Sequence, residues 1–454
     1  MKFLLHSADV RGLHSSGILR AAMVFMGGNL VATVLMGVGA IVQARFVGPD
    51  AMGLFQAFIT ITGYLTFLHL GVFDGLQREL PLRLGRGDHA AAEDAAAASV
   101  CWILLACMLC SLAFVGLALW SAIDLNWWQC AGWISVACIV SSALYGGYLM
   151  TTYRTSAHFT RLSLINMSKG GVSALTLFAL PWLGYYGLCL RAAITPVIHT
   201  LLLHWGRPLP VRPRFKLSEY WSVIRLGLPF GLIGYAGTRF WSSLESTFVL
   251  SALGMSSLGL FSIVFLAHQA MFNLVNHFMQ VYLPRVTEEW GRTRNIACCV
   301  RMCIAPTFLA VTSTLLLVAF CWVTIGPFVK WVIPDYVDAL PALEWACLIM
   351  PITALRLPRI VFLATGDIRG HGLSIGTGLA VFVIAALAVS TQGGGLVDIV
   401  FASLLGQLVQ SLMYYVLLYI RLKDSAPSVA AVSICSSAEV WDSKKAAPQT
   451  ASPD

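Results

Sequence analysis

The chain has 454 residues, of which 58% are hydrophobic and only 11% are charged, and its formal net charge is +8 at pH 7. A soluble domain carries about 25% charged residues, because its surface must be solvated. The composition therefore excludes a water-soluble protein. It indicates an integral membrane protein whose apolar segments are long enough to be helices rather than barrel strands.

Hydropathy predicts about twelve membrane-spanning helices, each of a length that can cross a bilayer. The predicted spans are 18–42, 53–73, 96–120, 129–150, 162–181, 185–204, 226–250, 257–281, 301–325, 339–362, 371–391 and 396–420. The connections between them are short, so the fold class is an all-α bundle without a sizeable globular domain. Residues 424–454 are rich in Ser, Ala and Pro without apolar periodicity, which predicts a disordered cytoplasmic tail.

The basic residues set the orientation of these spans. Counted over alternate connections, 24 Lys and Arg fall on one side of the membrane and only Arg45 and Lys330 on the other. The positive-inside rule makes the rich side cytoplasmic, so both termini are expected inside the cell. Because the positive charge follows the loops of a membrane protein, it does not indicate a nucleic-acid partner.

Two short motifs occur twice. The sequence GPDAMGLF at 48–55 is matched by GMSSLGLF at 254–261, and QRELP at 77–81 is matched by QVYLP at 280–284. The separations are 206 and 203 positions, which nearly halve the membrane domain. Glycine suits the reversal between two helices because it tolerates positive φ and close backbone approach.

The two repeats indicate an internal duplication. Six helices separate the copies, and an even number gives both halves the same orientation. Such parallel repeats are related by an axis along the membrane normal and flank a central substrate pathway. We therefore expect two parallel six-helix lobes, 1–205 and 206–423, around a central cavity.

Several motifs resemble those of a known family. ARFVGP at 44–49 followed by GLF at 53–55, QREL at 77–80 followed by LGRGD at 84–88, and ATGD at 364–367 resemble segments of bacterial polysaccharide-unit flippases. These form the polysaccharide-transporter branch of the multidrug/oligosaccharidyl-lipid/polysaccharide exporter superfamily. Glu245, nine positions before Gly254, also matches an acidic residue of that family, whereas Ser246 stands where the family often has a basic one. The resemblance extends over roughly 17–422.

This resemblance implies a multi-pass transporter of the bacterial cytoplasmic (inner) membrane. The implied substrate is a saccharide carried on a polyprenyl pyrophosphate lipid, and the implied partners are membrane lipid, a polysaccharide polymerase and glycosyltransferases. No cofactor is implied.

Four ionisable residues fall inside predicted spans, where a charge at the bilayer centre costs roughly 2.5–3.5 kcal/mol on insertion scales. They are Lys169, Arg191, Arg239 and Glu245. Such groups are candidates for substrate binding, and three cations against one acid favour an anionic substrate. On a helical wheel Glu245 points away from Arg239.

Polar residues on the eighth span share one face. An arc of about 100° at helical periodicity holds Gln269, Asn273, Asn276, His277 and Gln280. These side chains cannot face lipid without a large penalty, so we expect them to line the same hydrated cavity. His69 and Asp74, at the end of the second span, are weaker candidates.

Structural alternatives exist for some of these residues. Arg191 lies near the outer surface, where it could reach the head groups, and Glu245 could be solvated at that interface. A histidine such as His277 is more often structural than proton-coupling.

The sequence also excludes some chemistry. No Walker-type loop and no hydrolase or metalloprotease constellation is present, so we expect a protein that is not an enzyme and that binds no metal or cofactor. The function predicted is flipping of lipid-linked oligosaccharides by alternating access, for O-antigen, capsule or exopolysaccharide synthesis. The first alternative is a cation-coupled multidrug antiporter, which would need more buried carboxylates. The second is a membrane glycosyltransferase, polymerase or ligase, which would need longer catalytic loops.

Overall fold

The computed structural model describes residues 35, 37–156 and 158–425, and the side chains of 85, 269–278, 280, 281, 284 and 425 lie outside that description. Over these residues the chain is helical and contains no strand. Its elements are α2 (Pro49–Leu65), η2 (Thr66–His69), α3 (Val72–Gly85), α4 (His89–Ile123), α5 (Trp127–Thr155), α6 (Phe159–Leu175), η3 (Thr176–Ala179), α7 (Leu180–Trp205), α8 (Leu217–Tyr235), η4 (Ala236–Phe240), α9 (Trp241–Thr293), α10 (Ile296–Val332), η5 (Pro334–Ala339), α11 (Leu340–Ala346), α12 (Ile349–Leu355), α13 (Arg359–Thr365), α14 (Ile368–Thr391) and α15 (Leu396–Ser425).

The described residues form nine continuous helical stretches that are long and apolar enough to cross a membrane. Two of them, Phe159–Trp205 and Leu217–His268, each contain residues of two predicted spans. The chain reverses within them at Gly184 (φ 49°) and Gly254 (φ 84°), where a side chain would strain the backbone. The reversal at Gly254 brings Glu245 next to His268, with 3.9 Å between the Glu245 Oε2 and His268 Nδ1 atoms. All predicted spans from the second onward are therefore found, and the all-α fold class is confirmed.

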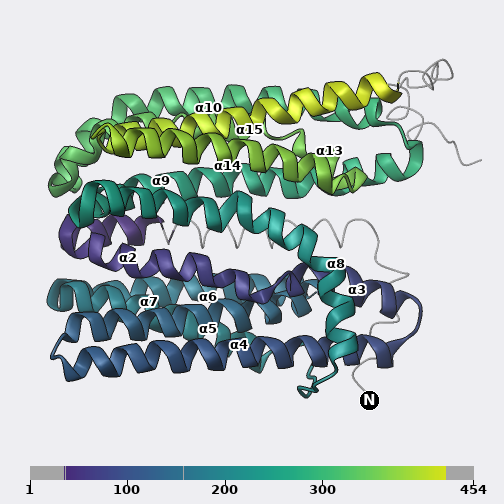
Figure 1. Cartoon of the computed structure of the whole chain (residues 1–454), viewed down its shortest axis with the longest axis horizontal. Helices are drawn as coiled ribbons and strands as arrows, with labels where there is room; N and C mark the ends of the chain where they lie inside the picture. The colour runs from purple at the N-terminus through teal and green to yellow at the C-terminus, as the bar shows by residue number, and fades with distance from the viewer. Residues whose placement is uncertain (1–34, 36, 157, 426–454) are drawn as a thin grey trace, which may run out of the picture.

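The helices form two lobes, seen one above the other in Figure 1. The first, called here the N-lobe, contains α2–α7, with α5 packed against α4 and α7. The second, the C-lobe, contains α9–α15, with α14 packed against α15. Each lobe has its own apolar core, and α2 packs against α9 where the lobes meet.

Helix α8 departs from this division. Although it follows the predicted lobe boundary at residue 206, it crosses to the N-lobe and lies against α3 and α4 (Figure 1). The fit against α3 is close: a methyl group at Gly75 would collide with the carbonyl of Val223, and one at Gly227 would collide with that of Gly71. The single turn of π-helix η4 then joins α8 to α9, which belongs to the C-lobe. Glycine at such contacts lets two helix backbones approach directly.

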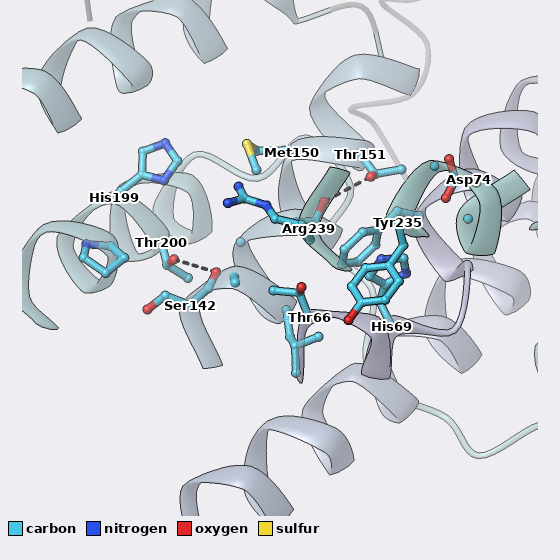
Figure 2. A pocket seen from close by; sticks show the side chains of 18 of the residues that line it. Thr66, His69, Asp74, Ser142, Met150, Thr151, His199, Thr200, Tyr235 and Arg239 are labelled. Atoms are coloured by element: carbon cyan, nitrogen blue, oxygen red, sulfur yellow. Dashed lines mark hydrogen bonds between the residues drawn. The ribbon is translucent and has the colours of Figure 1, made fainter. Parts of the chain in front are cut away.

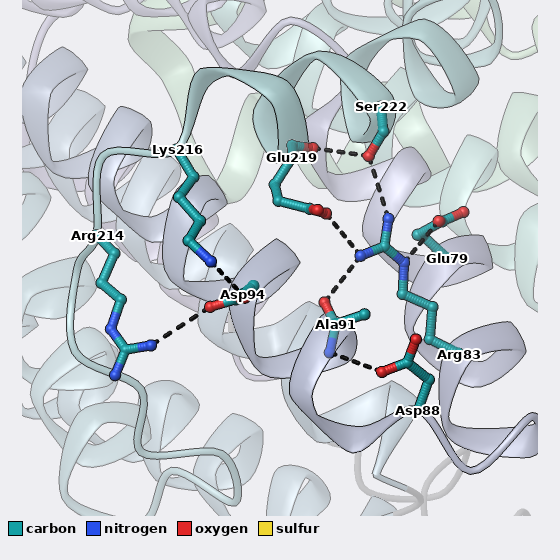
Figure 3. Close-up of polar contacts among 9 residues, drawn as sticks. All are labelled: Glu79, Arg83, Asp88, Ala91, Asp94, Arg214, Lys216, Glu219 and Ser222. Carbon is teal, nitrogen blue, oxygen red and sulfur yellow. Dashed lines mark hydrogen bonds and ion pairs between the residues drawn. The ribbon is translucent and has the colours of Figure 1, made fainter.

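Ion pairs hold α8 and the segment before it on the N-lobe (Figure 3). The Arg83 guanidinium donates to Glu79 at 2.7 Å and to Glu219 of α8 at 2.6 Å. Asp94 of α4 accepts from Lys216 at 2.5 Å and from Arg214 at 3.3 Å. The start of the second sequence half is thus attached to the first lobe.

Two predicted spans are broken rather than continuous. The second is interrupted between η2 and α3, where Leu70 (φ 45°) and Gly71 (φ 76°) adopt left-handed conformations. The tenth consists of η5 and the short helices α11, α12 and α13. Hydropathy registers the apolar length of a span but not local changes of backbone direction, so it predicted one helix in each place.

Candidate functional site

A cavity of about 770 Å³ lies beside the N-lobe helices, between η2, α3, α5, α6 and α7 on one side and α8 and η4 on the other. Its polar lining consists of Thr66, His69, Asp74, Gln77, Ser142, Thr151, Arg154, Asn166, Lys169, His199, Thr200, Tyr235, Thr238 and Arg239. The expectation was a cavity lined by both lobes. Among the described residues, the second half of the sequence contributes to the lining only through α8 and η4.

Two of the predicted cations, Lys169 and Arg239, line this cavity. Lys169 comes from α6 and Arg239 from η4, so they approach from opposite sides of the boundary between the N-lobe and α8–α9. In the part of the chain that the structure describes, neither has an ion-pair partner. In Figure 2 the Arg239 side chain points into the space between Met150 and His199.

Hydrogen-bonding groups surround these cations. The His199 ring lies 3.0 Å from the Asn166 amide oxygen, and the Thr200 hydroxyl donates to the Ser142 carbonyl at 3.4 Å (Figure 2). Polar side chains of two helices meet here, because Asn166 and Lys169 of α6 and His199 of α7 all line the cavity. Hydroxyl, amide and imidazole groups can bind a polar ligand without neutralising the cations.

The α3 end of the cavity has a different lining. Asp74 is the only acidic side chain among the described residues that line it. His69 stacks on Phe73 at 4.3 Å between ring centroids and accepts the Gly71 N–H at 3.0 Å, so it is held in place by its own turn. Arg154, which the sequence assigned to a cytoplasmic connection, also lines the cavity. The lining therefore carries three Lys or Arg side chains, two histidines and one carboxylate.

Arg191 lies outside the lining of this cavity. Its guanidinium donates to the side chain of Gln43 and, at 2.8 Å, to the Ser173 hydroxyl, with a further bond of 3.3 Å to the Ser173 carbonyl. Gly39 leaves room for the guanidinium, because a methyl group there would stand 2.9 Å from it. Arg191 thus does not line the cavity; its hydrogen bonds join the end of the first span to α6 and α7.

Glu245 also lies away from the cavity, in the C-lobe. Its carboxylate is buried, with 1% of the residue exposed. It accepts a hydrogen bond from the Trp241 indole at 2.9 Å and another from the Ser403 hydroxyl. The expectation that Glu245 and Arg239 face in different directions is confirmed, but the alternative of a solvated Glu245 is wrong, because α9 and α15 enclose it.

The sequence analysis missed Arg356. Hydropathy placed it near a span end and the charge count assigned it to the cytoplasm, yet it is 3% exposed inside the C-lobe. Its guanidinium donates to Thr353 at 2.8 Å, Gln407 at 3.0 Å and Gln410 at 2.9 Å. Gln407 in turn donates to Ser403 at 3.2 Å, which connects Arg356 to Glu245 through side chains of α15. The spacing of Ser403, Gln407 and Gln410 along a predicted helix was the available signal.

The five predicted lining residues of the eighth span, Gln269, Asn273, Asn276, His277 and Gln280, have side chains outside the described part of the structure. Their assignment to a cavity remains a prediction.

Comparison with known proteins gives the fold a counterpart. Neither a scan of family models nor a search of curated proteins finds a match. Among solved structures, an inward-facing conformation of a multidrug resistance MATE family transporter of the MOP superfamily aligns with a TM-score of 0.66 and 14% identity, over 91% of this chain and 99% of that one. An outward-facing conformation aligns with a TM-score of 0.64 and 14% identity, over 89% and 96% of the two chains.

A third similar structure is a MOP superfamily transporter from Pyrococcus furiosus, described as having a binding pocket of reverse polarity that suggests a different function. It aligns with a TM-score of 0.62 and 14% identity, over 89% of this chain and 95% of that one. At this identity the likeness establishes the fold. The described residues have the same fold as these transporters, with helices arranged in two lobes.

Proposed function

We propose that this protein is a membrane transporter that moves its substrate by alternating access of two lobes. The fold supports this, because its counterparts include both an inward-facing and an outward-facing transporter. The cavity supports it as well. It is bounded on one side by N-lobe helices and on the other by η4, which continues into the C-lobe, so a change in the angle between the lobes would alter its shape.

The single observation that favours an anionic substrate is the pair of cations without counter-ions. Lys169 and Arg239 face one cavity without an ion-pair partner among the described residues. A charge held in a low-dielectric interior is costly unless an opposite charge or water compensates it. A phosphate or diphosphate group would supply the opposite charge, and the amide, imidazole and hydroxyl groups nearby suit a saccharide.

On this basis we propose an amphipathic phosphorylated saccharide as the substrate, its lipid part remaining in the bilayer. A polyprenyl pyrophosphate-linked oligosaccharide, as the sequence resemblance implies, has this chemistry. Its transport would serve the synthesis of a surface or secreted polysaccharide in the cytoplasmic membrane.

A multidrug exporter is the second candidate, and the fold comparisons favour it: the two best-aligned structures above are both multidrug resistance transporters. Cationic drugs are attracted by carboxylates, however, and the described lining of the cavity has only Asp74. The reverse-polarity pocket described for the Pyrococcus furiosus transporter suggests that this fold is not restricted to one class of substrate.

The two candidates differ in what gene deletion changes. For the flippase, deletion should abolish the surface or secreted polysaccharide and leave lipid-linked saccharides on the cytoplasmic leaflet, without changing sensitivity to cationic dyes such as ethidium. For the drug exporter, deletion should raise sensitivity to the dye and leave polysaccharide unchanged. Normal polysaccharide in the deletion strain would contradict the flippase.

Complementation then tests the site. A Lys169→Gln/Arg239→Gln variant should insert into the membrane normally. Its export activity in the deletion strain should be lower than that of the parental protein by about tenfold or more. The matched control is Arg292→Gln, which removes an exposed arginine whose partner is Glu289, three residues earlier on the same helix. Equal complementation by both variants would remove the cavity cations from the mechanism.

A further inference from the structure

The two copies of the repeated motif meet in space. A methyl group at Gly53 would stand 2.9 Å from the Gly259 nitrogen, and one at Gly259 would stand 3.0 Å from the Gly53 nitrogen. The closest atoms are also related: the Gly53 position faces the carbonyl of Met255, and the Gly259 position faces that of Pro49. Gly53 and Gly259 are 206 positions apart, as are Pro49 and Met255, and this is the separation of the two copies. The motifs therefore form a crossing of α2 and α9 with approximate two-fold symmetry.

This crossing joins the two lobes on the side that the charge distribution assigns to the cell exterior. Gly53 and Thr66 are separated by 13 positions of helical chain, so the crossing lies about 20 Å from the cavity end of η2. Between them, the Ser243 hydroxyl donates to the Thr60 carbonyl at 3.3 Å, and Tyr64 bonds Thr247 at 2.8 Å. The seam between α2 and α9 is therefore continuous from the crossing to the cavity.

A hydrogen bond from the C-lobe reinforces the crossing. The Tyr336 hydroxyl of η5 donates to the Val47 carbonyl at 2.8 Å, and both residues are buried, with exposures of 1% and 3%. Val47 immediately precedes the first glycine of the N-lobe motif. The C-lobe thus holds the start of α2 from two sides, through α9 and through η5.

From this geometry we propose that the duplicated motifs are the two halves of an extracytoplasmic gate, with Tyr336 as its latch. The proposal rests on alternating access, because a transporter that rocks must open this seam to release substrate outward. The seam is suited to reversible opening. It consists of close backbone packing at the two glycines, single hydrogen bonds and apolar contacts in which Ala57 of α2 packs against the C-lobe core. No ion pair crosses it among the residues described.

The cytoplasmic edge provides the contrast. There, Arg83 and Asp94 fasten α8 and the segment before it to the N-lobe by ion pairs (Figure 3). The chain that links the lobes therefore stays attached to one of them, whereas the outer crossing can separate. The gate also gives the repeated sequence a role: each copy supplies the one glycine that the other copy needs for close approach.

The test is access to the cavity from outside the cell. A cysteine introduced by Thr238→Cys is labelled with a membrane-impermeant maleimide on intact cells, and labelling at residue 238 is read by peptide mass spectrometry, so that the native cysteines can remain. With the gate closed, labelling should be low. Gly53→Val should raise it about tenfold, because the side chain holds α2 and α9 apart.

Gly48→Val is the matched control, because Gly48 belongs to the same motif but a methyl group there meets nothing within 4 Å. It should leave labelling at the parental level. Tyr336→Phe, which removes only the latch hydroxyl and does not threaten folding, should raise labelling two- to fivefold. If Gly53→Val prevents folding, the Tyr336→Phe result decides alone.

Unchanged labelling in the folded Gly53→Val and Tyr336→Phe variants would overturn the gate. This outcome is distinct from failure of the proposed substrate, because labelling reports the opening of the seam and not what is carried. If the deletion strain made normal polysaccharide while the Gly53→Val and Tyr336→Phe variants showed increased labelling, the flippase would be refuted and the gate would be supported.

Discussion

Buried polar side chains are arranged differently in the two lobes. In the C-lobe, Glu245 and Arg356 are connected through hydrogen-bonded side chains of α15, and the space beside Glu245 amounts to about 10 Å³. Beside the N-lobe, Lys169 of α6 and Arg239 of η4 face about 770 Å³ of cavity. A charge that is enclosed by partners contributes to folding, whereas one that faces a cavity is available to a ligand. The first set therefore indicates structure and the second indicates binding.

Removal of the C-lobe guanidinium is expected to have the largest effect. Arg356→Met should lower the free energy of unfolding by about 3 kcal/mol, because Thr353, Gln407 and Gln410 all lose a charged donor in a buried site. The measurement is reversible denaturation in mixed micelles. Arg239→Met is the control, with an expected change within about 1 kcal/mol. Equal losses for both variants would break the distinction between the lobes.

The next effect concerns the C-lobe carboxylate. Glu245→Ala should lower the free energy of unfolding by about 2 kcal/mol. The Ser403 hydroxyl would lose its acceptor, and the Trp241 indole would keep only its longer bond of 3.4 Å to Ser403. Glu245→Gln retains a carbonyl oxygen and should lose less than half as much. If Gln and Ala were equally destabilising, the negative charge itself, rather than its hydrogen bonds, would be the stabilising feature.

The sequence predicted the order of the spans from the second onward, because apolar length is a property of each segment alone. It also found Lys169 and Arg239, since a charge in the middle of an apolar run is visible without tertiary information. It could not separate these from Arg191 and Glu245, which satisfy the same criterion. Only the fold shows that Arg191 is bound by Gln43 and Ser173, and that Glu245 is enclosed by α15.

Arg356 illustrates a second limit. A basic residue close to a span end is assigned to water by the positive-inside rule, and in most loops that assignment is correct. Here the tenth span is broken into short helices, and Arg356, which lies between α12 and α13, donates to Gln407 and Gln410 of α15. The repeated glycine motif shows the opposite case. It was recognised as a repeat in the sequence, but the contact between its two copies requires the arrangement of the lobes.

The third prediction is an increase in stability rather than a loss. Lys169→Met should raise the free energy of unfolding by about 1 kcal/mol, because it removes a partly buried charge that shares the cavity with Arg239. That charge has no ion-pair partner among the described residues. Thermal denaturation in detergent would measure the gain, and the same variant should lose transport. A clear loss of stability would show that Lys169 stabilises the fold, as Arg356 is expected to do, and does not serve mainly to bind a ligand.

The smallest expected effect concerns the hydrogen bond between His199 and Asn166 at the cavity wall. Hydrogen bonds between membrane helices contribute about 0.6 kcal/mol on average, because the unfolded state in the bilayer finds other partners. His199→Phe should therefore lower the free energy of unfolding by about that much. Both residues line the cavity, so transport should fall much further than stability does. Parallel losses in stability and transport would mean that this wall of the cavity serves packing, and the contrast between the lobes would then rest on Lys169 and Arg239 alone.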